Sequence, residues 1–276
     1  MAGAYIVEAM RYSLAAVLIA IPLVASADFV ATQLSDDGPM KAWFEPDATV
    51  ILPATATTGA LPPDKLDSFT NMEYGSMGPF KVGRSITGKR GDATWYLADV
   101  KQAWAISVDC PPALARCHHS RTLRLSELVV GDKAVAVHVD DPVPGTTTAS
   151  PVAADPIAGT TEAGPLAKLL VDPAAIAQTL LDDKTTFVLG TEVGEKAVGT
   201  AAAKKLLGTW SKLSLALEGK PREVTKGSWG YVAANVGWTV KAKKTVIRAT
   251  LYAVQVDGAW KVAGVHYSLP VHRMGY

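Results

Sequence analysis

The sequence lacks the features that mark several classes of protein. Its 276 residues contain two cysteines, and the spacings C-x2-C and H-x3-H of common zinc sites are absent. The net charge of +1 at pH 7 gives no sign of binding to nucleic acid or to an acidic membrane surface. Segment 88–91 (GKRG) lacks the glycine spacing and the Ser/Thr of a phosphate-binding loop. We therefore predict neither a metal nor a cofactor.

No apolar run at the N-terminus is long enough for a membrane span. The run Leu14–Val24 is short, whereas a spanning helix needs about 20 apolar residues. A positive charge at Arg11 precedes it, and the small residues 25–27 (ASA) follow it. This order is typical of an export signal. We predict a signal peptide over residues 1–27, cleaved near Ala27, and export to the periplasm or the extracellular space. The alternative is a buried first helix.

What the sequence does contain is an internal repeat. Three pairs of segments correspond: 95–100 (WYLADV) with 231–236 (YVAANV), 138–143 (HVDDPV) with 266–271 (HYSLPV), and 44–52 (FEPDATVIL) with 181–189 (LDDKTTFVL). A repeat length above about 100 residues indicates two copies of a whole domain and not a solenoid. The length of the chain also agrees with two domains of about 150 residues each.

The repeat predicts where the two domains begin and end. Residues 28–141 would form the first domain and residues 164–276 the second. Between them, residues 142–163 are rich in Pro, Thr, Ala and Gly, which predicts a semi-extended linker. Residues 1–163 carry a net charge of −6 and residues 164–276 a net charge of +7. This asymmetry would favour docking of the two domains; variation among solvated surface residues would produce it equally well.

Both cysteines bracket one loop, 109–116, that only the first copy contains. In an exported protein, Cys110 and Cys117 are most simply joined as a disulfide. Two alternatives are free thiols and a metal site that includes His118 and His119. Adjacent ligands rarely converge on one tetrahedral ion, which disfavours the metal site.

Each copy begins with helices and continues as strands. Helices are predicted over 28–44 and 166–181, divided near a proline, and over 195–210, with a weak counterpart at 64–69. Apolar strands are predicted over 49–52 and 186–189. The rest of the second copy is predicted as strands over 213–217, 222–226, 229–240, 246–256 and 260–269, with a tight turn at Asp257-Gly258. Helices followed by antiparallel strands predict an α+β fold.

Four segments of the second copy carry a family resemblance. They are strand 187–191 (FVLGT), the helix start with Glu195 and Gly199, strand 227–235 (GSWGYVAAN), and 260–262 (WKV) leading to 266–268 (HYS). In this order they resemble the nuclear transport factor 2-like superfamily, and within it the SnoaL-like and ketosteroid-isomerase-like domains. The resemblance covers most of residues 164–276 and, loosely, 28–141. It implies two tandem cone-shaped domains, each with N-terminal helices packed on a curved antiparallel sheet, that pair as an intramolecular pseudo-dimer.

The strand position of Asp99 in the first copy is held by Asn235 in the second. A carboxylate can take a proton from a carbon acid and an amide cannot, so Asp99 is a candidate catalytic base and Asn235 a candidate ligand contact. Strand alternation places Asn235 on the same face as Trp229 and Tyr231. If that face meets solvent, the position has no functional meaning.

A histidine recurs at one place in both copies, as His138 and His266. Such a histidine could be a general acid or base, with a pKa near neutrality, or a structural hydrogen-bonding group. The second copy also carries Trp210, Trp229, Trp238 and Trp260, which would either line a pocket for a flat apolar ligand or fill the core.

These residues lead to one prediction and two alternatives. We predict non-catalytic binding of a small apolar molecule or a partner protein in the second domain, through Trp210, Trp229, Tyr231, Asn235 and His266. The first alternative is an isomerase- or cyclase-like enzyme that uses His266 or Asp99. The second is an assembly module without an open pocket.

Overall fold

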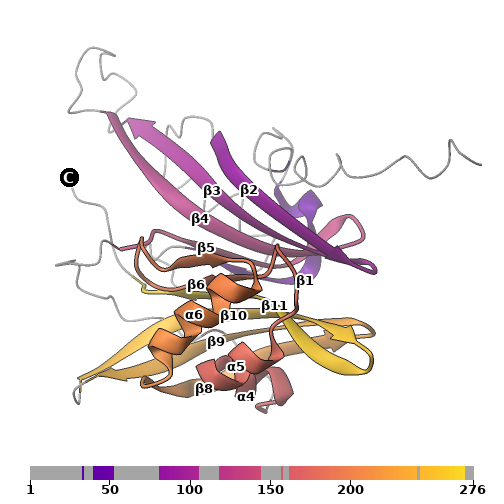
Figure 1. Cartoon of the computed structure of the whole chain (residues 1–276). Helices are drawn as coiled ribbons and strands as arrows, with labels where there is room; N and C mark the ends of the chain where they lie inside the picture. Colours follow the sequence, from indigo (N-terminus) through magenta and orange to yellow (C-terminus); the bar gives the residue numbers. More distant parts are fainter. Residues whose placement is uncertain are drawn as a thin grey trace, which may run out of the picture.

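The computed structural model describes residues 33, 40–52, 81–105, 118–143, 157, 162–240 and 243–270. They form two β-sheets with a few short helices, a mixed α+β fold (Figure 1). The predicted signal peptide, the helix at 64–69 and both cysteines lie outside the described residues, as does most of the predicted linker and of the helix at 28–44.

The first sheet has the strand order β1-β5-β4-β3-β2. Its elements are the 3-10 helix η1 (Met40–Trp43) and the strands β1 (Phe44–Ile51), β2 (Lys81–Arg90), β3 (Ala93–Ala105), β4 (His118–Val130) and β5 (Lys133–Asp140). β1 pairs with β5 in parallel, and the other pairs are antiparallel.

The second sheet has the order β7-β6-β11-β10-β9-β8. Its strands are β6 (Phe187–Leu189), β7 (Lys196–Val198), β8 (Ser214–Lys226), β9 (Trp229–Val240), β10 (Lys243–Val256) and β11 (Ala259–Ser268). Three helices accompany it: α4 (Pro165–Leu170), α5 (Pro173–Thr179) and α6 (Thr200–Trp210). Among the described residues, no helix has the length and apolar character to cross a membrane.

Apart from β7, the two sheets share one strand order and one pairing register. The predicted match of 44–52 with 181–189 is wrong by one residue, because Ile51 lies opposite His138 and Leu189, not Val188, lies opposite His266. In the first sheet Ser126 lies opposite His138, and in the second Thr250 lies opposite His266. In both, a bulge interrupts the last hairpin two residues further along, after Leu128 and after Tyr252. The equivalent residues are therefore Trp95 and Tyr231, Asp99 and Asn235, Arg124 and Arg248, Ser126 and Thr250, Glu127 and Leu251, His138 and His266, and Asp140 and Ser268.

Local chemistry explains where the helices of the second half start. The Asp172 side chain accepts a hydrogen bond of 2.9 Å from the Ala175 amide, and Pro173 opens α5, the predicted cap and first-turn pair. The helix predicted over 195–210 is shorter than expected. Residues 196–198 pair with β6 as β7, and Gly199, at a φ of 83°, turns the chain into α6.

The strands predicted over 213–217 and 222–226 are one strand, β8. An irregularity between Glu218 and Arg222, with Gly219 at a φ of 82°, replaces the predicted break. The Asp257-Gly258 turn has positive φ at both residues, as a primed hairpin turn requires.

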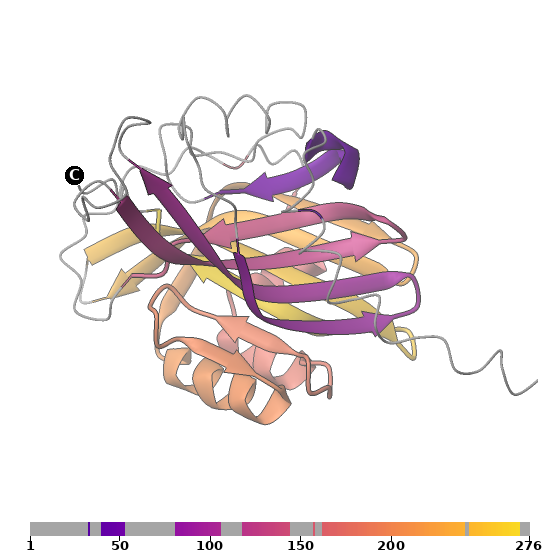
Figure 2. The same cartoon turned by 90° about the horizontal axis from the view of Figure 1, so that it is seen from above.

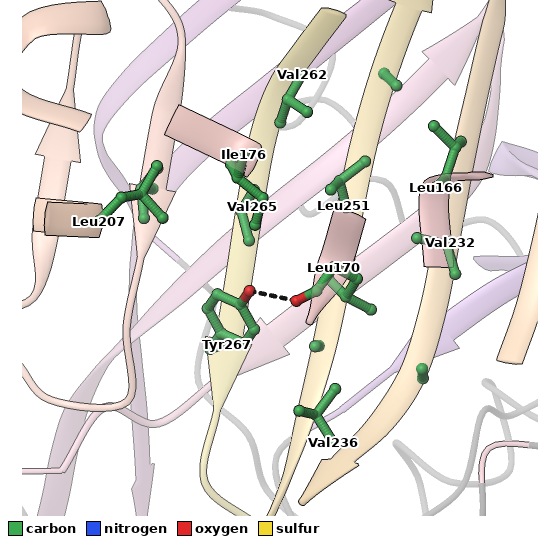
Figure 3. Close-up of a cluster of buried hydrophobic side chains, with 14 of the residues drawn as sticks. Leu166, Leu170, Ile176, Leu207, Val232, Val236, Leu251, Val262, Val265 and Tyr267 are labelled. Atoms are coloured by element: carbon green, nitrogen blue, oxygen red, sulfur yellow. Dashed lines mark hydrogen bonds between the residues drawn. The ribbon is translucent and has the colours of Figure 1, made fainter. Parts of the chain in front are cut away.

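Apolar layers lie on both faces of the second sheet. One lies between the sheets and joins Trp95, Leu97 and Leu128 to Trp229 and Tyr231, so that the first sheet covers the second (Figure 2). The other lies on the far face of the second sheet, under α4, α5 and α6 (Figure 3). There the Tyr267 hydroxyl donates a hydrogen bond of 2.6 Å to the Leu170 carbonyl of α4.

Candidate functional site

The recurring histidines meet between the two sheets. The rings of His138 and His266 stack with centroids 3.9 Å apart and planes inclined by 17°. Both side chains are wholly buried. The two copies of one sequence position therefore lie against each other between the sheets.

Each histidine is held by the opposite half of the chain. His138 lies 3.0 Å from the Thr250 hydroxyl and 2.7 Å from the Ser268 hydroxyl. His266 lies 2.8 Å from the Ser126 hydroxyl, and its Nε2 lies 3.0 Å from Asp140 Oδ1. Because Ser126 is equivalent to Thr250 and Asp140 to Ser268, the two sets of contacts are reciprocal. The chemical difference between the two sets is a carboxylate in the first half, where the second half has a hydroxyl.

A pair of equivalent arginines makes further hydrogen bonds between the two halves. Arg124 binds both oxygens of Asp140, at 3.1 and 2.5 Å, and donates across to the Gly190 carbonyl at 2.6 Å. Arg248 donates in the other direction, to the Leu52 carbonyl, at 2.5 Å. The Arg124–Asp140 pair is buried, so its charges are screened little by water.

Burial sets the protonation of this network. It lowers the pKa of His138 well below its ordinary value, and the neighbouring His266 and Arg248 lower it further. Burial also lowers the pKa of His266, although Asp140 opposes the shift. Burial alone would raise the pKa of Asp140, but His266 and Arg124 bring it below its usual range. Both histidines are therefore neutral at pH 7, and they join the sheets as hydrogen-bonding groups.

The other candidates from the strand positions also face the opposite half. Lys196 of β7 lies 2.6 and 2.7 Å from the Asp99 carboxylate oxygens. Asn235 is 5 % exposed, and its face is the one that carries Trp229 and Tyr231 toward the first sheet. Asp99, Asn235, His138 and His266 thus lie on the facing sides of the two sheets.

Trp210 alone among the predicted ligand contacts lies on the helix side of the second sheet. Its indole donates to Glu195 Oε1 at 3.0 Å and meets the Tyr267 ring edge-on at 5.5 Å. Beside it is a cavity of about 20 Å³, lined also by Trp238 and Ile247. Such a volume holds about one water molecule and is too small for an organic ligand.

Glu127 is a further buried acid of the first half. Glu127 in β4 is wholly buried; its Oε1 accepts a hydrogen bond of 3.1 Å from Gln33 Nε2, and its Oε2 has no hydrogen-bond partner. Burial raises the pKa of Glu127 to about 8, although the Gln33 hydrogen bond opposes the shift. Burial and Glu127 raise the pKa of Tyr96, the opposite residue on β3, to about 12.

Glu127 and Tyr96 project from the face of the first sheet that is turned away from the second. Their neighbours there, Ala98, Leu125 and Val137, belong to a separate apolar cluster. The equivalent face of the second sheet carries Leu251 and meets the helices. Sequence reasoning missed Glu127. The signal was available, because aligning the two copies sets Glu127 against leucine inside an apolar strand.

Within the described part of the chain, no three or more His, Cys, Asp or Glu side chains are placed to hold a metal ion. The predicted pairing of Cys110 with Cys117 lies outside that part and stays a prediction.

Comparison with known proteins finds similarity to solved structures over part of this chain. No family model matches the sequence, and no curated protein matches it. Among solved structures, a nuclear transport factor 2-like protein of unknown function from Pseudomonas putida is 15% identical, with a TM-score of 0.33, over 37% of this chain and 76% of its own. A nuclear transport factor 2-like superfamily protein from Salmonella enterica is 17% identical, with a TM-score of 0.32, over 38% and 84%. A designed protein with a curved β-sheet is 15% identical, with a TM-score of 0.28, over 37% and 89%.

Proposed function

We propose that this chain is a non-catalytic small-molecule binding protein made of two nuclear transport factor 2-like halves. In this proposal the halves pair as an intramolecular pseudo-dimer through His138 and His266, and the ligand binds in the first half against Glu127. The mature protein is exported after cleavage near Ala27.

The observation that carries the proposal is the unpartnered Oε2 of Glu127. A buried polar atom without a partner costs about 1–3 kcal/mol, and a carboxyl with a pKa near 8 is mostly protonated at pH 7. Because Oε1 already accepts from Gln33, the proton belongs on Oε2. Glu127 then offers a single hydrogen-bond donor in an apolar surrounding, which suits an apolar ligand that carries one carbonyl or ether acceptor.

The second half supports the same role less well. Its cavity beside Trp210 holds about 20 Å³, too little for an organic molecule. His266 and Asp99, the candidates for catalysis, bind groups of the opposite half. Their contacts favour a structural role in the pseudo-dimer.

An acid–base enzyme centred on Glu127 is the second candidate. A pKa of about 8 lies near neutrality, where a general acid or base works best. A glutamine at this position can donate a hydrogen bond but cannot transfer a proton. The Glu127→Gln variant therefore distinguishes a binding protein from an enzyme.

Native mass spectrometry of the protein purified from its own host tests the proposal. We expect wild type to carry a small-molecule adduct that Glu127→Gln retains and that Glu127→Leu, which copies the second half, loses. Glu218→Leu, at a partly exposed glutamate of β8, is the matched control and should keep the adduct.

An adduct that Glu127→Leu retains would place the ligand elsewhere and would contradict the proposal. Turnover of the co-purified compound by wild type and not by Glu127→Gln would establish the enzyme instead.

A further inference from the structure

A cavity of about 120 Å³ opens between the two sheets, and neither Glu127 nor the histidines line it. The first half contributes Glu45, Asp47, Val130 and Val135 to its wall, and the second contributes Val224, Lys226, Trp229 and Tyr231. Its volume is six times that of the cavity beside Trp210. The interface of this chain therefore has an open place lined by charged and aromatic side chains.

The internal repeat supplies a second copy of this place, and there it is closed. Tyr231 and Val224 of the open side are equivalent to Trp95 and Gly88. The Trp95 indole lies so close over Gly88 that a Cβ on the glycine would fall 2.2 Å from the ring. Its Nε1 donates to the Thr185 hydroxyl at 3.2 Å and to the Thr185 carbonyl at 3.4 Å. An indole and its N–H donor thus fill the closed side.

The cavity stays open on its own side because two residues there differ from their equivalents in the other copy. Val224 occupies the space above the strand where Gly88 admits the indole, and Tyr231 turns its hydroxyl to Thr49 at 3.0 Å instead of filling the gap. The residue that faces the indole N–H on the closed side also differs from the residue at the open cavity. Asp47 and Thr185 each lie three residues before the equivalent residues Val50 and Val188, with Asp47 in an irregular stretch of β1. Asp47 lines the open cavity and supplies a carboxylate there, whereas Thr185 supplies a hydroxyl on the closed side.

We propose that the open cavity binds a small organic ammonium with a flat apolar body. The body takes the volume that Trp95 fills on the closed side, and the ammonium takes the place of the indole N–H and meets the carboxylates of Asp47 and Glu45. No salt bridge to either carboxylate occurs among the described residues. Cationic N–H donors form the stronger hydrogen bonds to carboxylates.

One cationic side chain, Lys226, lines the cavity, and a second, Arg222, contacts the wall residue Asp47; both bear on the class of ligand. Lys226 Nζ lies 6.0 Å from the centre of the Trp229 ring, and Arg222 donates to the backbone carbonyl of Asp47. Lys226 could meet a carboxylate on the ligand, so both a plain amine and an amino acid contain the required chemistry. A ligand with an anionic group alone would meet Glu45 and Asp47 unfavourably.

Isothermal titration with 2-phenylethylamine, phenylalanine and 3-phenylpropionate tests this site on the full chain. We expect saturable binding of one 2-phenylethylamine, and no binding of 3-phenylpropionate, which has the same body and the opposite charge. The Glu45→Gln/Asp47→Asn variant should weaken binding at least about tenfold. The Val224→Gly/Tyr231→Trp variant rebuilds the closed side and should abolish binding.

The affinity for phenylalanine distinguishes an amino acid from a plain amine as the ligand. Tighter binding than 2-phenylethylamine assigns the ligand carboxylate to Lys226, and weaker binding assigns a plain amine; both results support the proposed class. Equal binding of 3-phenylpropionate, unchanged affinity of Glu45→Gln/Asp47→Asn, or no saturable binding would overturn it. Glu127→Leu leaves this cavity intact, so amine binding by that variant keeps the test independent of the site at Glu127.

Discussion

At the scale of the residue, the two copies can carry side chains of opposite polarity at equivalent buried positions. Glu127 and Leu251 occupy the same place in the two sheets, yet one is a buried acid with an unpartnered oxygen and the other is an apolar side chain. Residues that reduce stability without a structural return often serve function. A direct stability measurement can show whether Glu127 is such a residue.

We expect Glu127→Leu to raise the free energy of unfolding by about 1–3 kcal/mol near pH 4.5, because it removes an unpartnered buried polar atom. The advantage should grow as pH rises from 4.5 to 8, by up to about 1.4 kcal/mol per pH unit. In that range the unfolded glutamate releases a proton that the folded one keeps, so the wild type becomes less stable as pH rises. Urea unfolding across this range measures both effects.

Glu127→Gln is the control for that prediction, because it keeps the size and the Gln33 contact but does not titrate. Its stability relative to Glu127→Leu should not vary with pH. A Glu127→Leu variant less stable than wild type would show that Glu127 is a structural residue.

At the scale of the element, patterns in the sequence predicted most of the strands but missed β7 and the continuity of β8. β9 matches the predicted strand 229–240, because apolar alternation and the flanking glycine are local signals. β7 was hidden, since residues 196–198 are three residues long and precede a helix with the same apolar spacing. Only pairing with β6, a contact made by tertiary structure, identifies them as a strand.

The candidate site was harder to predict than the elements for a related reason. Alternation placed Asn235, Trp229 and Tyr231 on one face correctly, but it cannot say which sheet face meets a helix and which meets the other half. The equivalent histidines were recognised as a pair, whereas their direct stacking follows from docking of the two sheets.

The N-terminal cap of α5 provides a test at this scale. Asp172→Ala removes the side chain that accepts from the Ala175 amide and should lower the free energy of unfolding by about 1 kcal/mol. Asp182→Ala changes an exposed aspartate ten residues further along and should alter it by less than about 0.5 kcal/mol. Equal effects of the two changes would contradict a capping role for Asp172. Thermal or urea unfolding provides the comparison.

At the scale of the whole molecule, the halves are joined by groups that must stay neutral. His138 and His266 are stacked and buried beside Arg124 and Arg248, so protonation of either ring would place like charges together. Among the described residues, Asp140 is the one carboxylate in contact with the two rings. Acid is therefore expected to act on this interface before other parts of the described fold.

We expect stability to fall as pH drops below about 6.5, the ordinary histidine pKa. Both folded pKa values are lowered, so the unfolded chain binds protons that the folded chain does not, and each histidine contributes up to about 1.4 kcal/mol per pH unit. Urea unfolding in the Glu127→Leu background measures this slope without the opposing titration of Glu127.

The His138→Gln variant should reduce that slope by about half, because one of the two titrating rings is gone. A slope that is flat between pH 7.5 and 5, or one that His138→Gln leaves unchanged, would show that these histidines are not buried and neutral.

We infer that the two copies form one cooperative unit through the reciprocal contacts of His138 and His266. Hydrogen exchange of the backbone amides in β3 and β4, compared with those in β9 and β10, tests it most directly. We predict the same opening free energy for the most protected amides of both sheets, since neither sheet keeps its partner when the other unfolds. Exchange of the first sheet through an opening several kcal/mol less costly than that of the second would contradict the account.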